Sequence, residues 1–116
     1  MIVVAIIGIL AAIAIPLYAN VQARARIAKA QADSRALASA ISIYAAHMAV
    51  VPTNAQGLDS LTVVAVNGLG QSAGPFMAKI PAPPAGWTTQ YAYTGDTTSG
   101  TFVINSSGDN TTVSLP

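Results

Sequence analysis

The sequence predicts an α+β fold in which one long N-terminal α-helix packs on a small antiparallel β-sheet of about three strands. The chain begins with an uninterrupted apolar run that passes into an alanine-rich amphipathic segment. The rest is rich in Gly and Pro and ends in short segments of alternating apolar and polar residues. Its 116 residues suffice for one modest domain. We therefore divide the chain into a hydrophobic helix at 1–23, its amphipathic continuation at 24–51, and a globular part at 52–116.

The apolar run covers residues 1–19, and the first charged side chain is Arg24. About 20 residues of apolar α-helix span the ~30 Å hydrocarbon core of a bilayer. Because the run is apolar on all sides, it has to be buried on all sides. A secretory signal peptide is the alternative, but the run has no basic region ahead of it and no small-residue cleavage site. We expect a membrane helix.

Gly8 and Pro16 interrupt this run with two residues that weaken an α-helix. One interpretation is a kinked membrane helix. The other is a stretch between these residues that loses helical hydrogen bonds once the segment leaves lipid, because unsatisfied backbone groups are costly in hydrocarbon. Both residues are therefore predicted helix-melting or kink positions.

The amphipathic segment runs from residue 20 to about residue 50, with apolar residues spaced alternately by three and four. This spacing places them on one face of a continuous helix. Pro52 supplies the stop. With the apolar run, the helix would have roughly 50 residues and a length of ~75 Å. The residues predicted to pack this helix on the domain are Ile27, Leu37, Ile41, Tyr44 and Met48.

Four of the five basic residues follow the apolar run closely: Arg24, Arg26, Lys29 and Arg35. Such a juxtamembrane cluster is typical of the cytoplasmic side of a membrane anchor. The alternative is a solvated helix face in which Asp33 lies among the cations.

The sequence of the C-terminal half predicts a short capped helix at 53–61, with Thr53 or Asn54 as its N-cap. It also predicts a loop at 67–75. Alternating segments separated by Gly, Asp and Asn predict an antiparallel meander that buries one face on the long helix. Its three strands are expected at 89–94, 101–105 and 111–115.

The side chains available for chemistry are few. The chain has no Cys, a single His and four acidic residues, all of them Asp, so we predict no catalytic residue and no enzyme. The net charge of +1 is too small to attract nucleic acid, so we predict that no nucleic acid is required as a partner. His47 is expected at the surface near the end of the helix, where the dipole favours a cation.

Asp109, with Ser106, Ser107 and Asn110 beside it, is the best local candidate for calcium. One carboxylate makes a weak site, and an Asp in a hairpin turn usually bonds its own backbone. We therefore favour the turn and predict no metal and no cofactor.

Residues 1–16 (MIVVAIIGILAAIAIP) closely resemble the signal region shared by type IV pilins and type II secretion pseudopilins. Mature members of that superfamily usually begin a few residues earlier, with an N-methylated Phe and a segment containing a Glu that this sequence lacks. Residues 56–61, 74–81 and 102–109 are similar to G-type major pseudopilins. Those proteins typically carry a calcium loop rich in Gly and Asp, whereas Asp109 is followed here by Asn110-Thr111-Thr112.

The resemblance implies a type IV pilin-like fold and a structural subunit of a helical bacterial filament, either a type IV pilus or a type II secretion pseudopilus. It implies an inner-membrane state before assembly, followed by a periplasmic pseudopilus or an extracellular pilus. This overrides the cytoplasmic placement that the basic cluster indicates. The implied partners are identical subunits, membrane lipid, and inner-membrane machinery with an ATPase and a prepilin peptidase.

A single-span membrane-anchored binding domain that does not polymerise is the alternative function. In the filament, the large apolar side chains of the leading segment would form the core. These predicted packing residues, in membrane or filament core, are Ile2, Val3, Val4, Ile6, Ile7, Ile9, Leu10, Ile13 and Ile15.

Overall fold

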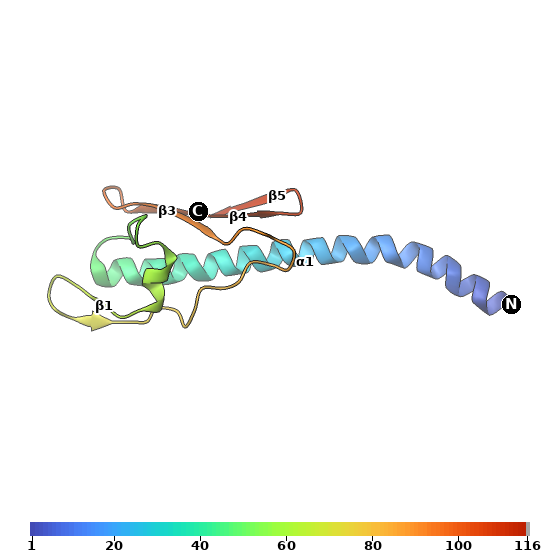
Figure 1. Ribbon diagram of the computed structural model, residues 1–116, viewed down its shortest axis with the longest axis horizontal. Helices are drawn as coiled ribbons and strands as arrows, with labels where there is room; N and C mark the ends of the chain where they lie inside the picture. Colours follow the sequence, from blue (N-terminus) through green and yellow to red (C-terminus); the bar gives the residue numbers. More distant parts are fainter. Residues whose placement is uncertain (116) are drawn as a thin grey trace.

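The computed structural model of the chain describes residues 1–115, and its dominant element is the 47-residue helix α1, Ile2–Met48. The molecule extends 77 × 23 × 19 Å because the front half of α1 projects beyond the rest of the chain (Figure 1). The helix continues through Pro16, and its N-terminal part bends away from the axis of the rest. Proline removes one helical N–H and crowds the preceding turn, which is sufficient cause for a bend.

The C-terminal end of α1 lies at Met48, before the Pro52 that was expected to end it. Ala49 adopts a left-handed conformation with φ 64°, and its N–H donates to the carbonyl of Ala45 at 2.8 Å. This capping bond satisfies one of the terminal carbonyls of the helix. The chain then turns back, and Val51 and Pro52 are buried.

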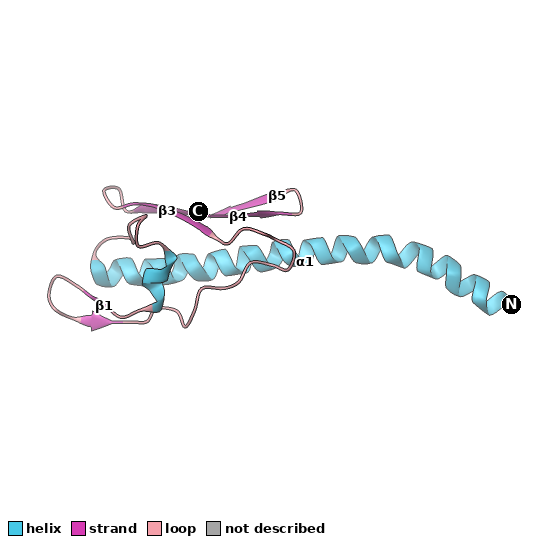
Figure 2. Cartoon of the chain, in the orientation of Figure 1, coloured by secondary structure: helices cyan, strands magenta, loops and turns pink. Residues whose placement is uncertain are grey.

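A three-stranded antiparallel meander forms the main sheet, and Figure 2 shows it along the back half of α1. Its strands are β3 (Ala92–Asp96), β4 (Thr101–Gly108) and β5 (Thr111–Leu115), in the order β3-β4-β5. Ile104 pairs with Tyr93, and Ser106 pairs with Val113. Ile104, Ser106 and Val113 are buried, as expected where alternate side chains of a strand point to one face. The sheet therefore covers one side of the helix.

The first strand of this sheet lies later in the chain than the prediction of 89–94. The shift follows from the turn after it, where Asp96 Oδ1 accepts the N–H groups of Thr98 at 2.8 Å and Ser99 at 3.3 Å. An Asp that bonds the backbone two residues ahead ends a strand and starts a turn. These bonds hold the pKa of Asp96 below its ordinary value.

A second, two-stranded antiparallel sheet flanks residues 67–71, so its second strand falls within the loop that the sequence predicted at 67–75. Its strands are β1 (Ala65–Val66) and β2 (Ser72–Ala73). Asn67 closes the connection, since its Oδ1 accepts the N–H of Leu69 at 3.0 Å and that of Gln71 at 2.9 Å. The loop prediction was therefore wrong at residues 72–73, which form β2, because an Asn side chain here supplies the turn bonds of a hairpin.

The predicted short helix at 53–61 is a turn followed by the 3₁₀-helix η1, Leu58–Thr62. Thr53 caps the turn instead of the helix: its Oγ1 accepts the N–H of Gln56 at 3.2 Å, and Gln56 Oε1 accepts the N–H of Thr53 at 2.9 Å. Asn54 Oδ1 accepts the N–H of Gly95 at 2.7 Å, which ties this segment to β3.

The core lies between α1, the main sheet and η1. Leu37, Ile41 and Tyr44 of α1 are buried there, and Ile27 and Met48 are partly buried against the same cluster. Leu61, Trp87, Tyr91 and Ile104 close it from the other elements.

Candidate functional site

The front half of α1 is the largest apolar surface of the described chain. All nine side chains expected in a membrane or filament core are exposed, and Val21 is 54% exposed. The helix contains a window apolar and long enough to cross a membrane, none of it buried within residues 1–115. Exposed apolar surface of this extent marks a contact with lipid or with another protein.

The free energy at stake in this segment is large. Full burial of an Ile, Val or Leu side chain contributes about 1.5–3 kcal/mol relative to water. Nine such side chains correspond to roughly 14–27 kcal/mol, so the segment is not stable in contact with water. Lipid and a protein core are both apolar, and the choice between them depends on packing.

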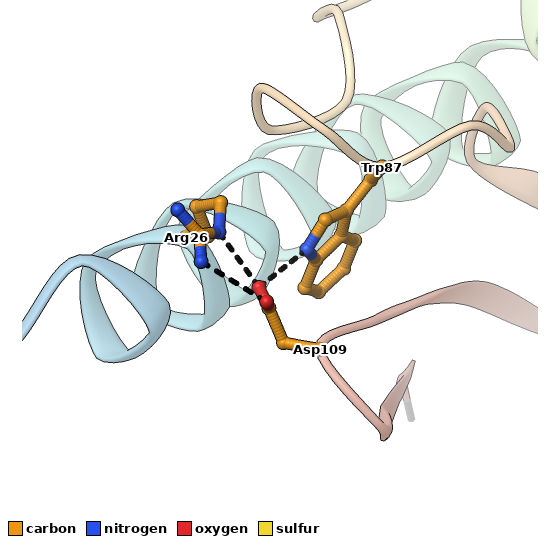
Figure 3. Close-up of polar contacts among 3 residues, drawn as sticks. All are labelled: Arg26, Trp87 and Asp109. Carbon is orange, nitrogen blue, oxygen red and sulfur yellow. Dashed lines mark hydrogen bonds and ion pairs between the residues drawn. The ribbon is translucent and has the colours of Figure 1, made fainter. Parts of the chain in front are cut away.

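A polar cluster joins the base of this segment to the sheet, and Figure 3 shows its three side chains. Arg26 donates from Nε to Oδ2 of Asp109 at 2.7 Å and from Nη2 to Oδ1 at 3.0 Å. Trp87 donates from Nε1 to Oδ2 of the same carboxylate at 2.8 Å. A two-pronged guanidinium–carboxylate pair fixes geometry as well as charge. One carboxylate therefore connects α1, the loop before β3 and the β4–β5 turn.

The β4–β5 turn aims the Asp109 side chain at the helix. Asp109 and Asn110 both have positive φ, 51° and 58°, as two-residue hairpin turns require, and Asp and Asn tolerate this conformation. The favoured prediction that Asp109 bonds its own backbone was wrong, because both carboxylate oxygens accept from residues far away in the chain. Arg26 and Asp109 are 83 positions apart, so local patterns carried no signal for this pair.

The cluster depends on ionised partners. The Arg26 and Trp87 donors lower the pKa of Asp109 to about 2, and the bond to Asp109 raises the pKa of Arg26. Both side chains remain partly exposed, at 30% and 24%. Solvent screening therefore reduces the stabilisation that the pair provides.

The Asp109 pair makes stability sensitive to acid. A carboxyl group whose pKa is lower in the folded than in the unfolded state stabilises the fold above the unfolded value of about 3.9. This contribution is lost as the pH falls from about 4 to 2. We expect Asp109→Asn to lower the melting temperature at neutral pH and to weaken its dependence on pH in this window, as measured by circular dichroism in detergent.

Asp59→Asn is the matched control for this prediction, because Asp59 is exposed and forms no ion pair within residues 1–115. It should leave both the melting temperature and its acid dependence nearly unchanged. Equal behaviour of the two variants would contradict the role assigned to Asp109.

A second polar cluster joins the same loop to α1. Asp33 Oδ2 accepts from Lys29 Nζ and from the Tyr91 hydroxyl, each at 2.5 Å, and Lys29 also donates to the carbonyl of Ala82 at 2.7 Å. Burial, together with the bond to Asp33, raises the pKa of Tyr91. Of the four cations in the basic cluster, Arg26 and Lys29 thus pair within the described chain.

The remaining candidate for chemistry, His47, lies at the end of α1. Its Nε2 is 3.2 Å from the carbonyl oxygen of Ala65, and its ring lies 6.2 Å from that of Phe76. No group of three potential metal-ligating side chains exists among the described residues. Asp109, the one position considered for calcium, directs its oxygens at N–H donors, one of them cationic.

A long helix that is exposed in front and carries a small antiparallel sheet behind defines a pilin-like α+β protein. The family model of type II secretion system (T2SS), protein G, matches residues 18–114. The chain therefore belongs to the type II secretion system protein G family, the G-type pseudopilins.

Two relatives illustrate this kinship. The type II secretion system core protein G of Pseudomonas aeruginosa is 32% identical over 112 residues, which cover 93% of this chain and 77% of that protein. The type II secretion system core protein G of Vibrio cholerae is 34% identical over 98 residues, which cover 83% of this chain and 67% of that protein. These matches confirm the resemblance inferred from the residues. The sequence left two filaments open, and the matches support the secretion pseudopilus and not the extracellular pilus.

Proposed function

We propose that this protein is a structural subunit of the helical pseudopilus of a type II secretion system. The observation that carries this proposal is the uncovered apolar half of α1, which no part of the described chain buries. A helical array of parallel copies would bury these segments against one another in a central core. The rigid attachment of the sheet through Arg26 and Asp109 would then hold each globular part at a constant position beside its helix.

Before assembly, the same segment would lie in the inner membrane with the globular part in the periplasm. Residues 2–21 of an α-helix are about 30 Å long, which equals the thickness of the hydrocarbon core. An ATPase that acts through other proteins of the assembly machinery is the partner we propose for the transfer from membrane to filament. A prepilin peptidase of the same machinery is a further partner we propose. Gly8 and Pro16 are the positions at which we propose that the helix bends or loses hydrogen bonds during that transfer.

The role we propose is mechanical and not enzymatic. We also propose that Arg26 and Trp87, and not a calcium ion, hold the β4–β5 turn, because they already satisfy the Asp109 carboxylate. The melting curves of the wild-type protein with calcium and with a chelator should then coincide. A melting temperature that rises with calcium would contradict this part of the proposal.

Filament formation is tested by expressing the chain in cells with the secretion machinery and imaging sheared fractions by electron microscopy. We expect fibres from the wild type and none from Ile9→Asp. A charge near the centre of a membrane helix costs about 2.5–3.5 kcal/mol by insertion scales, and a buried charge in the fibre core is also unfavourable. The matched control is Val64→Asp, on an exposed side chain of the globular part.

Val64→Asp should leave membrane insertion intact, since residue 64 lies outside the apolar segment. A wild type that remains a membrane-bound monomer with the machinery present would contradict the filament and favour a membrane-anchored binding domain.

A further inference from the structure

Two charged residues that form no ion pair in the described chain, Arg24 and Asp96, lie at opposite ends of its globular part. Arg35 in the middle of α1 and Lys79 beside Ile43 also form none. Arg26 and Lys29 are paired with Asp109 and Asp33 within residues 1–115. Arg24, at the base of the projecting segment, is exposed and forms no ion pair among the described residues. Among the side chains of residues 1–115, the carboxylates that form no ion pair are those of Asp59 and Asp96.

Asp96 lies at the end of the molecule away from the N-terminus. It occupies the β3–β4 turn, and its neighbour Gly95 is bonded to Asn54, just beyond the end of α1. Figure 1 shows this turn and the C-terminal end of α1 at the same end of the molecule. The Asp96 carboxylate is exposed and forms no ion pair among residues 1–115.

Arg24 and Asp96 are too far apart to meet within one chain. About 24 helical residues, or ~36 Å, separate Arg24 from the end of α1. A parallel copy displaced by this distance along α1 would bring its Arg24 level with the Asp96 end of the first copy. Opposite charges placed in this way favour one register of two copies over others.

The same displacement provides a surface for the apolar segment. It sets residues 2–21 of the displaced copy beside residues 26–45 of the first. That stretch of α1 has an exposed stripe of uncharged residues, spaced by three and four and bordered by Arg35, which we call the uncharged face: Ala28, Ala32, Ala36, Ser39, Ile43 and Ala46.

The uncharged face is unusual for a helix in contact with water, where the face opposite the core normally carries charged and polar residues. Its large side chain, Ile43, is 55% exposed. Phe76 and Met77 border a groove beside Ile43, which widens the apolar area. The small residues on either side of Ile43 allow a second helix to approach closely.

We propose that a second copy of this chain, displaced by about 36 Å along α1, docks its residues 2–21 on the uncharged face and its Arg24 against Asp96. The proposal rests on the proposed function and adds to it the register of neighbouring subunits. The positions of Arg24 and Asp96 set this displacement, and the uncharged face lies where the displacement places residues 2–21.

A double-mutant cycle in fibre-forming cells tests the charge pair. Arg24→Gln and Asp96→Asn each remove one charge, and the Asn retains the Oδ1 that caps the turn. We expect each single variant to reduce fibre yield about two- to fivefold, as for an exposed ion pair, and the double variant to be no worse than either. Arg35→Gln combined with Asp96→Asn is the control, and its effects should be independent. Independent effects of Arg24→Gln and Asp96→Asn would overturn the pairing.

Disulfide cross-linking tests the register without relying on a charge effect. The chain contains no Cys, so Arg24→Cys with Asp96→Cys introduces the only thiols. Oxidised fibres should give a ladder of covalent oligomers on denaturing gels, whereas Lys79→Cys with Asp96→Cys should not. Fibres without the ladder would overturn the register and leave the proposed function intact. Absence of fibres from the wild type would overturn both.

Discussion

Ile41→Ala should lower the free energy of unfolding by about 2–5 kcal/mol, the range for truncating a buried aliphatic side chain. Ile41 is 0% exposed and belongs to the cluster that joins α1 to the sheet and η1. Truncation leaves a cavity that the rigid helix and the short strands cannot fully close. In a domain of about 100 residues, this loss corresponds to a melting temperature lower by roughly 10 °C or more.

The control lies two residues further along the same helix. Ile43→Ala makes the same chemical change at a side chain that is 55% exposed, so it should alter the stability of the monomer by about 0.5 kcal/mol or less. Denaturant unfolding of both variants in detergent, followed by circular dichroism, measures the difference. Similar losses at the two positions would show that the sheet does not pack on α1 as described.

Gly108→Ala should destabilise the protein by about 1–3 kcal/mol, the usual effect of adding a methyl group to a packed site. A Cβ atom on Gly108 would lie 2.4 Å from Cδ1, Cδ2 and Cε2 of the Trp87 ring, far inside van der Waals contact. The ring would have to move, and its bond to Asp109 would be lost with it. The effect therefore combines a steric clash with the loss of a polar contact.

Trp87 is the only tryptophan of the chain, so its fluorescence reports this movement directly. We expect the emission of Gly108→Ala to shift to the red as the indole becomes exposed. Gly68→Ala is the control, because a Cβ there meets no atom within 4 Å and the backbone φ is not positive. A variant at Gly108 with wild-type emission and stability would contradict the contact.

The helix and its division into two halves were predictable because both signals are local. An apolar run without charge is visible in a window of about 20 residues. The periodicity of Leu37, Ile41 and Tyr44 is visible in a window of similar length. The β4–β5 hairpin was equally predictable from the sequence, since Asp109-Asn110 stands between two segments of alternating apolar and polar residues. The resemblance of residues 1–16 rests on the same local run.

The contacts that join these elements were not predictable in this way. Arg26 and Asp109 are 83 positions apart, and Tyr91 and Asp33 are 58 apart, so no local window contains both members of either pair. The hairpin of β1 and β2 was missed because two-residue strands have no periodicity, although Asn67 and Gly70 mark its turn.

Composition and periodicity were thus enough to establish a long helix whose apolar front half has to be buried by lipid or protein. The reason is that burial of apolar surface depends on residue type and spacing. They also indicated a small sheet behind it. The direction of the Asp109 side chain, the pairing of Arg26 and Lys29, and the charges left free for a neighbour depend on distances across the folded chain. These distances arise only when the sheet packs on the helix, since an ion pair or a hydrogen bond forms only between groups a few ångströms apart.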